Sequence, residues 1–213
     1  MKVRYSYLPQ QFGDCEDLWE DLRTLVTTGD FTLGKPLTEF EESFAELIGT
    51  KYAIGVNSGT DAIKLSLKAI GIEPGDEVIT AANTFVATVG AICELGATPI
   101  FVDCDDTFCM NVDLVEEKIT EKTKALLPVH YTGYMTDMRA INRLSEKYNI
   151  PVIEDAAGAI GSVYHGKRAG SMGKFGVFSF HGTKTLTTGE GGIFVTNNAD
   201  LYDKVLILNN HGR

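Results

Sequence analysis

A single lysine in a loop of small residues is the first feature of this sequence that could do covalent chemistry. Lys184 lies in the stretch SFHGTKTLTTGEGG, residues 179–192, between an apolar run typical of a buried strand and a loop with three glycines. Most lysines lie on the surface, so a solvated lysine on a flexible loop is the plain interpretation. A lysine held in a pocket instead forms covalent bonds with aldehydes. The residues that accompany Lys184 must decide between the two.

Two more apolar runs end in residues that could bind parts of a flat, charged ligand. Ser58, Gly59 and Thr60 follow YAIGV and open a predicted helix, and such turns bind phosphate. Phe85 follows EVITA, where its ring could stack on a planar group. The plain alternatives are helix capping by the hydroxyl residues and a core position for the phenylalanine.

A carboxylate and a further hydroxyl complete the set. Asp155 follows the apolar run PVIE and could bind a metal, a histidine or a protonated ring nitrogen, or simply cap a helix. Ser179 lies five residues before Lys184 and could add a hydroxyl to a phosphate site. A phosphate site, a stacking face, a carboxylate and an amine are what pyridoxal phosphate needs from a protein. Their joint occurrence predicts a pyridoxal phosphate site.

The elements that must position these residues alternate along the chain. Strands are predicted at 52–56, 77–81, 98–102, 125–129, 151–154, 176–180 and 192–196, with helices at 60–70, 86–95, 112–119, 137–148 and 199–209. A capping-box pattern at Thr38 and Glu41 predicts the start of an earlier helix. This alternation predicts an α/β fold with a mainly parallel, seven-stranded sheet and helices on both faces. Ligands of such sheets bind beyond the carboxyl ends of the strands, where the candidates lie.

Composition narrows the possible partners and compartment. The chain has 213 residues and a formal net charge of −10, which argues against nucleic acid and anionic membranes as partners. No apolar run reaches the roughly 18 residues of a membrane span, and the N-terminus lacks the apolar core of a signal peptide. Four cysteines without metal-ligand spacing predict reduced thiols, a cytoplasmic protein and no metal site: Cys15, Cys93, Cys104 and Cys109.

Six segments, in family order, show that the chain resembles the DegT/StrS family of sugar aminotransferases, which belongs to the fold-type I class of pyridoxal phosphate enzymes. They are NSGTDAI (57–63), GDEVITAANTFVAT (75–88), GATPIFVD (96–103), IEDAAGAIGS (153–162), FGVFSFHGTKTLTTGEGG (175–192) and NNHGR (209–213). The resemblance implies that Lys184 is the Schiff-base lysine and Asp155 the partner of the pyridine nitrogen. It also implies that the phosphate is bound around Ser58, Gly59, Thr60 and Ser179, with Phe85 stacked on the ring.

The resemblance implies an aminotransferase that moves an amino group, from L-glutamate, to a keto group of a nucleotide-linked deoxysugar. GTKTLTTGEGG is similar to the branch that makes 4-amino-4,6-dideoxy sugars such as perosamine, which enter polysaccharides including O-antigen. A homodimer is expected. Two alternatives stay open: a sugar dehydratase, whose branch has histidine in place of the lysine, and a non-catalytic cofactor-binding or regulatory fragment.

Two departures from the family pattern stand out. Family members commonly carry glutamine, histidine or glutamate three residues after the ring-binding aspartate, near the cofactor's phenolic oxygen, where this chain has Gly158. Family members are also nearly twice as long. The resemblance therefore implies that residues 36–213 form the cofactor-binding large domain, and that the small C-terminal domain is absent from these 213 residues. The spacing of Leu18, Leu22 and Leu25 predicts an amphipathic helix within residues 1–35, and the stretch GDFTLGKPL after it predicts an arm.

Overall fold

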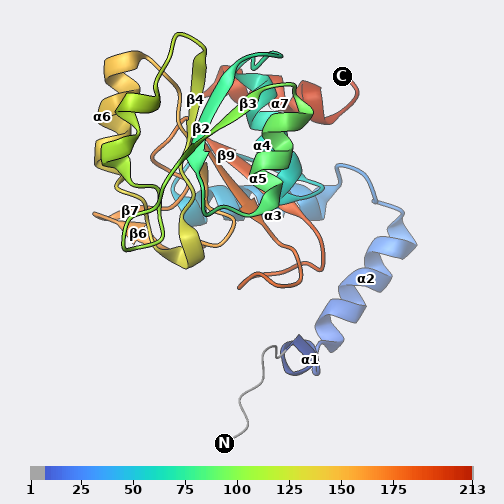
Figure 1. Cartoon of the computed structure of the whole chain (residues 1–213). Helices are drawn as coiled ribbons and strands as arrows, with labels where there is room; N and C mark the ends of the chain where they lie inside the picture. Colours follow the sequence, from blue (N-terminus) through green and yellow to red (C-terminus); the bar gives the residue numbers. More distant parts are fainter. Residues whose placement is uncertain (1–7, 213) are drawn as a thin grey trace, which may run out of the picture. The chain divides into compact units, whose positions relative to one another are not determined.

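The computed structural model describes residues 8–212 (Figure 1). Residues 1–7 of the predicted N-terminal region, and Arg213 at the end of the NNHGR segment, lie outside the described residues. The chain divides into two compact units, one up to Phe40 and one from Glu41 onward. The first unit contains α1 (Leu8–Gln11), the predicted amphipathic helix α2 (Glu16–Thr28) and the beginning of α3 (Lys35–Ile48).

Helix α3 begins earlier than its sequence pattern predicts. The helix starts at Lys35, whose N–H donates to the Asp30 carboxylate at 3.0 Å, so the aspartate caps the first turn. Thr38 therefore lies inside the helix, and the predicted capping box is wrong. Glu41, the other half of that pattern, instead accepts a hydrogen bond from the Gly55 N–H at 2.7 Å and fastens α3 to strand β1 (Tyr52–Val56).

The seven predicted strands form, but they build a mixed sheet, in which the pairings of β9 are antiparallel and the others are parallel. One ladder has the order β1-β9-β8-β5 and the other β3-β2-β4. Strand β9 runs antiparallel to both of its neighbours, because only a loop and no crossover helix joins it to β8. The strands are β1, β2 (Glu77–Ala81), β3 (Thr98–Val102), β4 (Thr123–Leu127), β5 (Ile153–Asp155), β8 (Phe175–Ser179) and β9 (Gly192–Thr196).

Backbone contacts between β4 and β5 join the two ladders. Parallel bridges pair Leu126 with Val152 and Val129 with Asp155. The Asp155 N–H donates to the Pro128 carbonyl at 2.9 Å, and the Asp155 carbonyl accepts from the His130 N–H at 3.0 Å. The backbone of Asp155 is therefore held from both sides at the end of its strand. A short separate hairpin follows, made of β6 (Val163–Tyr164) and β7 (Lys167–Arg168).

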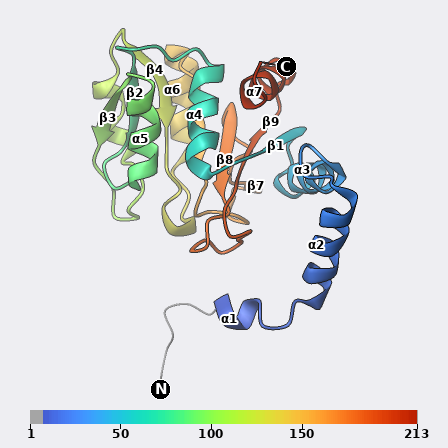
Figure 2. The ribbon, with the colours of Figure 1, turned by 90° about the vertical axis from the view of Figure 1, so that its right-hand side faces the viewer.

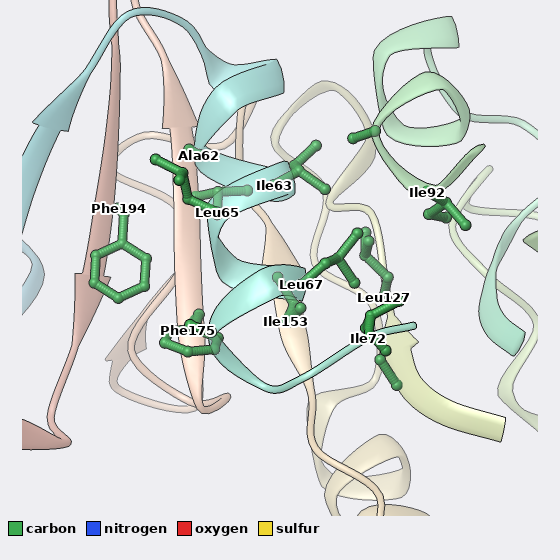
Figure 3. Packing of buried hydrophobic residues seen from close by; sticks show 14 of the residues in the cluster. Ala62, Ile63, Leu65, Leu67, Ile72, Ile92, Leu127, Ile153, Phe175 and Phe194 are labelled. Atoms are coloured by element: carbon green, nitrogen blue, oxygen red, sulfur yellow. The ribbon is translucent and has the colours of Figure 1, made fainter. Parts of the chain in front are cut away.

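Helices cover both faces of the sheet, as predicted. Helices α4 (Gly59–Ala69), α5 (Val86–Glu94) and α7 (Ala199–Asn209) pack on one face, and α6 (Met138–Tyr148) packs on the other (Figures 1 and 2). Each face of the sheet has its own hydrophobic cluster, one packed with α4 and the other with α6. Consecutive strand residues alternate between them, since Val78 lies in the cluster with α4 and Ile79 in the cluster with α6. Figure 3 shows Leu127, Ile153, Phe175 and Phe194 of the sheet packed against α4.

One predicted helix is replaced by tighter turns. The segment 112–119 forms two 3₁₀ turns, Val112–Leu114 and Glu116–Lys118, and a third 3₁₀ turn spans Tyr131–Gly133 after β4. Within residues 8–212, no helix combines the length and the apolar character needed to cross a membrane.

Candidate active site

The candidate residues converge on one edge of the sheet. Strands β1 and β8 are both antiparallel to β9, so they run in the same direction as each other. Strand β5 is parallel to β8, and β2 is parallel to β4, which is bridged in parallel to β5. The carboxyl ends of β1, β2, β5 and β8 therefore share an edge, which carries the residues singled out in the sequence.

The turn at the start of α4 provides several hydrogen-bond donors. Ser58 is the N-cap, and its Oγ accepts from the Asp61 N–H at 3.1 Å, which confirms the capping interpretation. Capping does not exclude phosphate binding, because the hydroxyl can donate its hydrogen while it accepts one. Gly59 and Thr60 lie in the first turn, whose N–H groups lack acceptors within the helix.

Close packing seats this turn on the ends of β8 and β9. A Cβ atom on Gly59 would lie 2.8 Å from the Cβ of Ser179, so the serine from β8 adjoins the helix N-terminus. A Cβ atom on Gly192 would lie 2.2 Å from the Ser58 carbonyl carbon. The need for glycine at position 192 is thus steric.

We expect Gly192→Ala to push the Ser58 backbone, and with it the turn at the start of α4, away from β9. The added methyl collides with backbone, which cannot rotate away, so stability should fall by about 1–3 kcal/mol. Urea unfolding followed by circular dichroism measures the loss. Gly90→Ala is the matched control, because a Cβ there meets nothing within 4 Å and alanine favours the interior of α5. Equal stability of the two variants would contradict the steric role of Gly192.

Asp155 is a buried carboxylate with two defined donors. Its side chain is 5% exposed; Oδ2 accepts from the Thr88 hydroxyl at 2.8 Å and Oδ1 from the Ala157 N–H at 3.1 Å. Turns and no helix come directly after Asp155, so the helix-cap alternative is wrong. Burial raises the pKa of Asp155, while the two hydrogen bonds and the Lys184 ammonium oppose that rise.

Lys184 lies in the loop between β8 and β9. Its N–H donates to the His181 carbonyl at 2.9 Å, which forms a turn, and its side chain is half-buried. Its positive charge is close enough to lower the pKa of Asp155. The structure therefore places the Lys184 charge within electrostatic range of the carboxylate that the sequence singled out.

Phe85 is 71% exposed, so the alternative of a core position is wrong. It is the N-cap residue of α5, and its carbonyl accepts from the Thr88 N–H at 3.1 Å. Thr88 is also the residue that donates to Asp155, and its hydroxyl accepts in turn from Thr84 at 2.7 Å. One turn of helix thus links the free aromatic face to the buried carboxylate.

Glu154, the neighbour of Asp155, was not recognised from the sequence. Its carboxylate is buried on the opposite face of the sheet and accepts four hydrogen bonds, from His130 Nε2 and from the N–H groups of Gly170, Met172 and Gly173. The Thr136 N–H donates to His130 Nδ1 at 3.3 Å, so Nε2 carries the ring proton. His130 therefore has a structural role. The only sequence signal for Glu154 is a second acidic residue at a buried strand end.

Gly158 has room for a side chain. A Cβ atom there would lie no closer than 3.8 Å to any neighbouring atom, the nearest being the Thr132 nitrogen, and its φ lies outside the left-handed region. Close backbone packing therefore does not explain this glycine. Across residues 8–212, no group of three or more histidine, cysteine, aspartate and glutamate residues could hold a metal ion.

Comparison of the chain with known proteins identifies its family. The model of the DegT/DnrJ/EryC1/StrS aminotransferase family matches residues 14–213. The chain is 44% identical over 192 residues to GDP-perosamine synthase of Caulobacter vibrioides, covering 90% of this chain and 52% of that protein. It spans about half the length of the curated relatives it matches.

Solved structures agree with this match. An aminotransferase from Psychrobacter cryohalolentis superimposes with a TM-score of 0.91 at 34% identity, over 100% of this chain and 53% of that one. A Streptococcus pneumoniae structure described as a sugar aminotransferase in its PLP form gives a TM-score of 0.88 at 34% identity, over 93% and 56%. The family expected from the sequence motifs is confirmed: the chain belongs to the DegT/DnrJ/EryC1/StrS aminotransferase family.

Proposed function

We propose that this chain supplies the pyridoxal phosphate site of a sugar aminotransferase, with residues 36–213 as its cofactor-binding large domain. The observation that carries the proposal is a buried carboxylate, Asp155, that lies within electrostatic range of the half-buried Lys184 at the edge where α4 begins. An enclosed carboxylate matches a protonated ring nitrogen, and a nearby amine matches an aldehyde.

The residues present fit the cofactor. Its phosphate would be held by the first N–H groups of α4 and by the hydroxyls of Ser58, Thr60 and Ser179. Glycine at position 59 lets the helix start approach Ser179, since a Cβ atom there would collide with the serine. Asp155 would hold the proton of the pyridine nitrogen, and the exposed ring of Phe85 would cover one face.

Each protein group then has a defined task. When bound, pyridoxal phosphate supplies an aldehyde that condenses with amines and a ring that withdraws electrons from the carbon next to the nitrogen. The Lys184 amine holds the cofactor and then moves a proton between the donor's α-carbon and the cofactor's C4′ atom. The Asp155 carboxylate keeps the ring nitrogen protonated, which preserves the ring's capacity to accept electrons.

For the substrates, we propose L-glutamate as amino donor and a nucleotide-linked ketosugar as acceptor. The similarity to GDP-perosamine synthase and the GTKTLTTGEGG segment support a 4-amino-4,6-dideoxy sugar as product, for polysaccharide such as O-antigen. Lys184 disfavours the dehydratase alternative, since that branch carries histidine there. The acidic chain and its four free cysteines support a cytoplasmic location.

We also propose a homodimer. Large apolar side chains stay exposed near the carboxyl edge of the sheet, among them Phe85 (71%), Val86 (70%), Phe108 (63%) and Tyr134 (60%). An exposed apolar set of this kind around a ligand site is typical of a surface that another chain covers. Sedimentation velocity at several concentrations tests the assembly, and a monomer at every concentration would contradict it.

Reduction with borohydride tests the proposed function. The protein, mixed with pyridoxal phosphate, should absorb in the visible region, and borohydride should leave the cofactor's mass on the peptide that contains Lys184. Labelling of a different lysine, or no labelling at saturating cofactor, would overturn the proposal. Turnover of nucleotide-linked ketosugars with L-glutamate then separates an aminotransferase from a fragment that binds cofactor without catalysis.

We expect Gly158→Gln to fold and bind pyridoxal phosphate, because a side chain at position 158 has space. Glycine offers no group to the cofactor's phenolic oxygen, so water or another side chain must bind that oxygen. A glutamine amide would replace this partner and shift the pH at which the visible absorbance changes. Absorbance titration measures the shift, and Gly158→Ala controls for the added volume. A variant that folds but titrates like the wild type would contradict the contact.

A further inference from the structure

We propose that Thr88 is a positioning residue that orients the Asp155 carboxylate toward the pyridine nitrogen of the cofactor. This inference rests on the proposed function and concerns a residue outside the set predicted from the sequence. It starts from a chain of two hydroxyl groups that ends on Asp155.

The direction of this hydroxyl chain follows from the chemistry of its ends. An ionised carboxylate only accepts hydrogen bonds, so Thr88 must donate its single hydroxyl hydrogen to Asp155 Oδ2 at 2.8 Å. Thr88 Oγ1 can then only accept from Thr84, which lies 2.7 Å away. The side chain of Thr88 is buried, so water does not compete for these bonds. The hydroxyl has one orientation, and it fixes one carboxylate oxygen.

The same residue ties the carboxylate to the stacking group. Thr88 lies in the first turn of α5, and its N–H donates to the carbonyl of Phe85 at 3.1 Å. The position of the Phe85 backbone and the orientation of Asp155 are therefore set by one turn of helix. A planar ring between them would have its face and its nitrogen located by the same element.

The hydroxyl also favours the charged form of Asp155. Burial raises the pKa of this carboxyl, and the Thr88 hydrogen bond is the strongest opposing influence, ahead of the Ala157 N–H and the charge of Lys184. Removing the hydroxyl would raise the pKa further. A protonated Asp155 cannot accept the proton of the pyridine nitrogen, so cofactor affinity should fall on acidification. In a variant without the hydroxyl, this fall should begin at a higher pH.

Thr88→Val tests the proposal, because valine keeps the shape and removes the hydroxyl. The dissociation constant of pyridoxal phosphate, measured by absorbance between pH 5 and 8, should rise about tenfold at neutral pH and more steeply on acidification. Thr88→Ser should restore both the affinity and the pH profile. Thr80→Val is the matched control: Thr80 is equally buried, and its hydroxyl donates to the Leu127 carbonyl at 2.8 Å, away from Asp155. It should lower stability without changing the pH profile.

A second variant keeps the test decisive if Thr88→Val does not fold. Thr84→Val removes only the outer hydroxyl, and it should shift the dissociation constant in the same direction by about two- to threefold. Wild-type affinity and pH profile in Thr88→Val, or in Thr84→Val if that is the folded variant, would overturn the role of Thr88. Labelling of Lys184 by borohydride in the same samples would show that the proposed function survives that outcome. Absence of labelling in the wild type would overturn both proposals.

Discussion

Lys184→Arg should abolish covalent attachment of pyridoxal phosphate while leaving the fold intact. Arginine keeps the positive charge, but its guanidinium does not lose a proton under working conditions and so cannot attack an aldehyde. The half-reaction with L-glutamate should slow by about 10⁴-fold or more, because attachment and proton transfer are both lost. Since Lys184 is half-buried in a loop, stability should change by less than about 1 kcal/mol.

Mass spectrometry after borohydride reduction and rapid-mixing absorbance give the two measurements. Lys204→Arg is the control, since it makes the same exchange at an exposed site on α7. Lys184→Ala adds a second check, because small primary amines supplied in solution should restore part of the proton transfer in the cavity left by the lysine. If the Lys184→Arg protein is still labelled and has normal half-reaction rates, Lys184 neither attaches the cofactor nor transfers the proton.

Asp155→Asn should separate cofactor binding from catalysis. The amide fills the same volume but carries no charge, so it cannot stabilise a protonated pyridine nitrogen. We expect the cofactor to bind more weakly and the half-reaction with L-glutamate to slow by about 10²–10³-fold, as when a preorganised electrostatic group is removed. Stopped-flow absorbance measures the rate at saturating cofactor. An unchanged rate would contradict the catalytic role of Asp155 and leave it a structural role, through its hydrogen bonds with Thr88 and Ala157.

Without cofactor, Asp155→Asn should not reduce the stability of the folded protein, although it slows catalysis. Burial raises the pKa of Asp155 in the folded state, so the unfolded chain ionises first as the pH rises. The folded state therefore loses stability between the ordinary and the raised pKa, and the loss is complete above the raised value. Asp155→Asn removes this penalty. The variant should be at least as stable as the wild type at neutral pH and show a flatter pH dependence in thermal unfolding.

The sequence was most informative where strands end. Ser58, Phe85, Asp155 and Ser179 could be assigned to one sheet edge because apolar runs mark buried strands, and the structure places all four there. The direction of β9 could not be predicted from its apolar residues, since a strand buried on both faces has the same composition in either direction. Only the absence of a helix in the connection, residues 180–191, carried that information.

Long-range contacts were beyond prediction. Thr88 bonds to a residue 67 positions away, and nothing in its local pattern distinguishes it from any other threonine in a first helical turn. Three donors to Glu154 lie 16 to 19 positions later, in a turn that no periodicity describes, and the fourth, His130, lies 24 positions earlier, after β4. The predicted capping box at Thr38 was wrong for a related reason. Asp30 accepts from the first N–H group of α3, and the sequence does not predict the path of the loop that brings it there.

The surroundings of Glu154 constrain how this sequence can diverge. Three of its four partners are backbone N–H groups, which only a change to proline removes, and glutamine would turn an N–H group toward a donor in either orientation of its amide. Any other substitution at positions 170, 172 and 173 leaves that conflict in place. In a library randomised at 154 and 155 together, selection for folded protein should retain glutamate at 154 while it admits neutral residues at 155. Selection for transamination should then restore aspartate at 155. Two adjacent carboxylates would therefore be selected by two different assays, one for folding and one for activity.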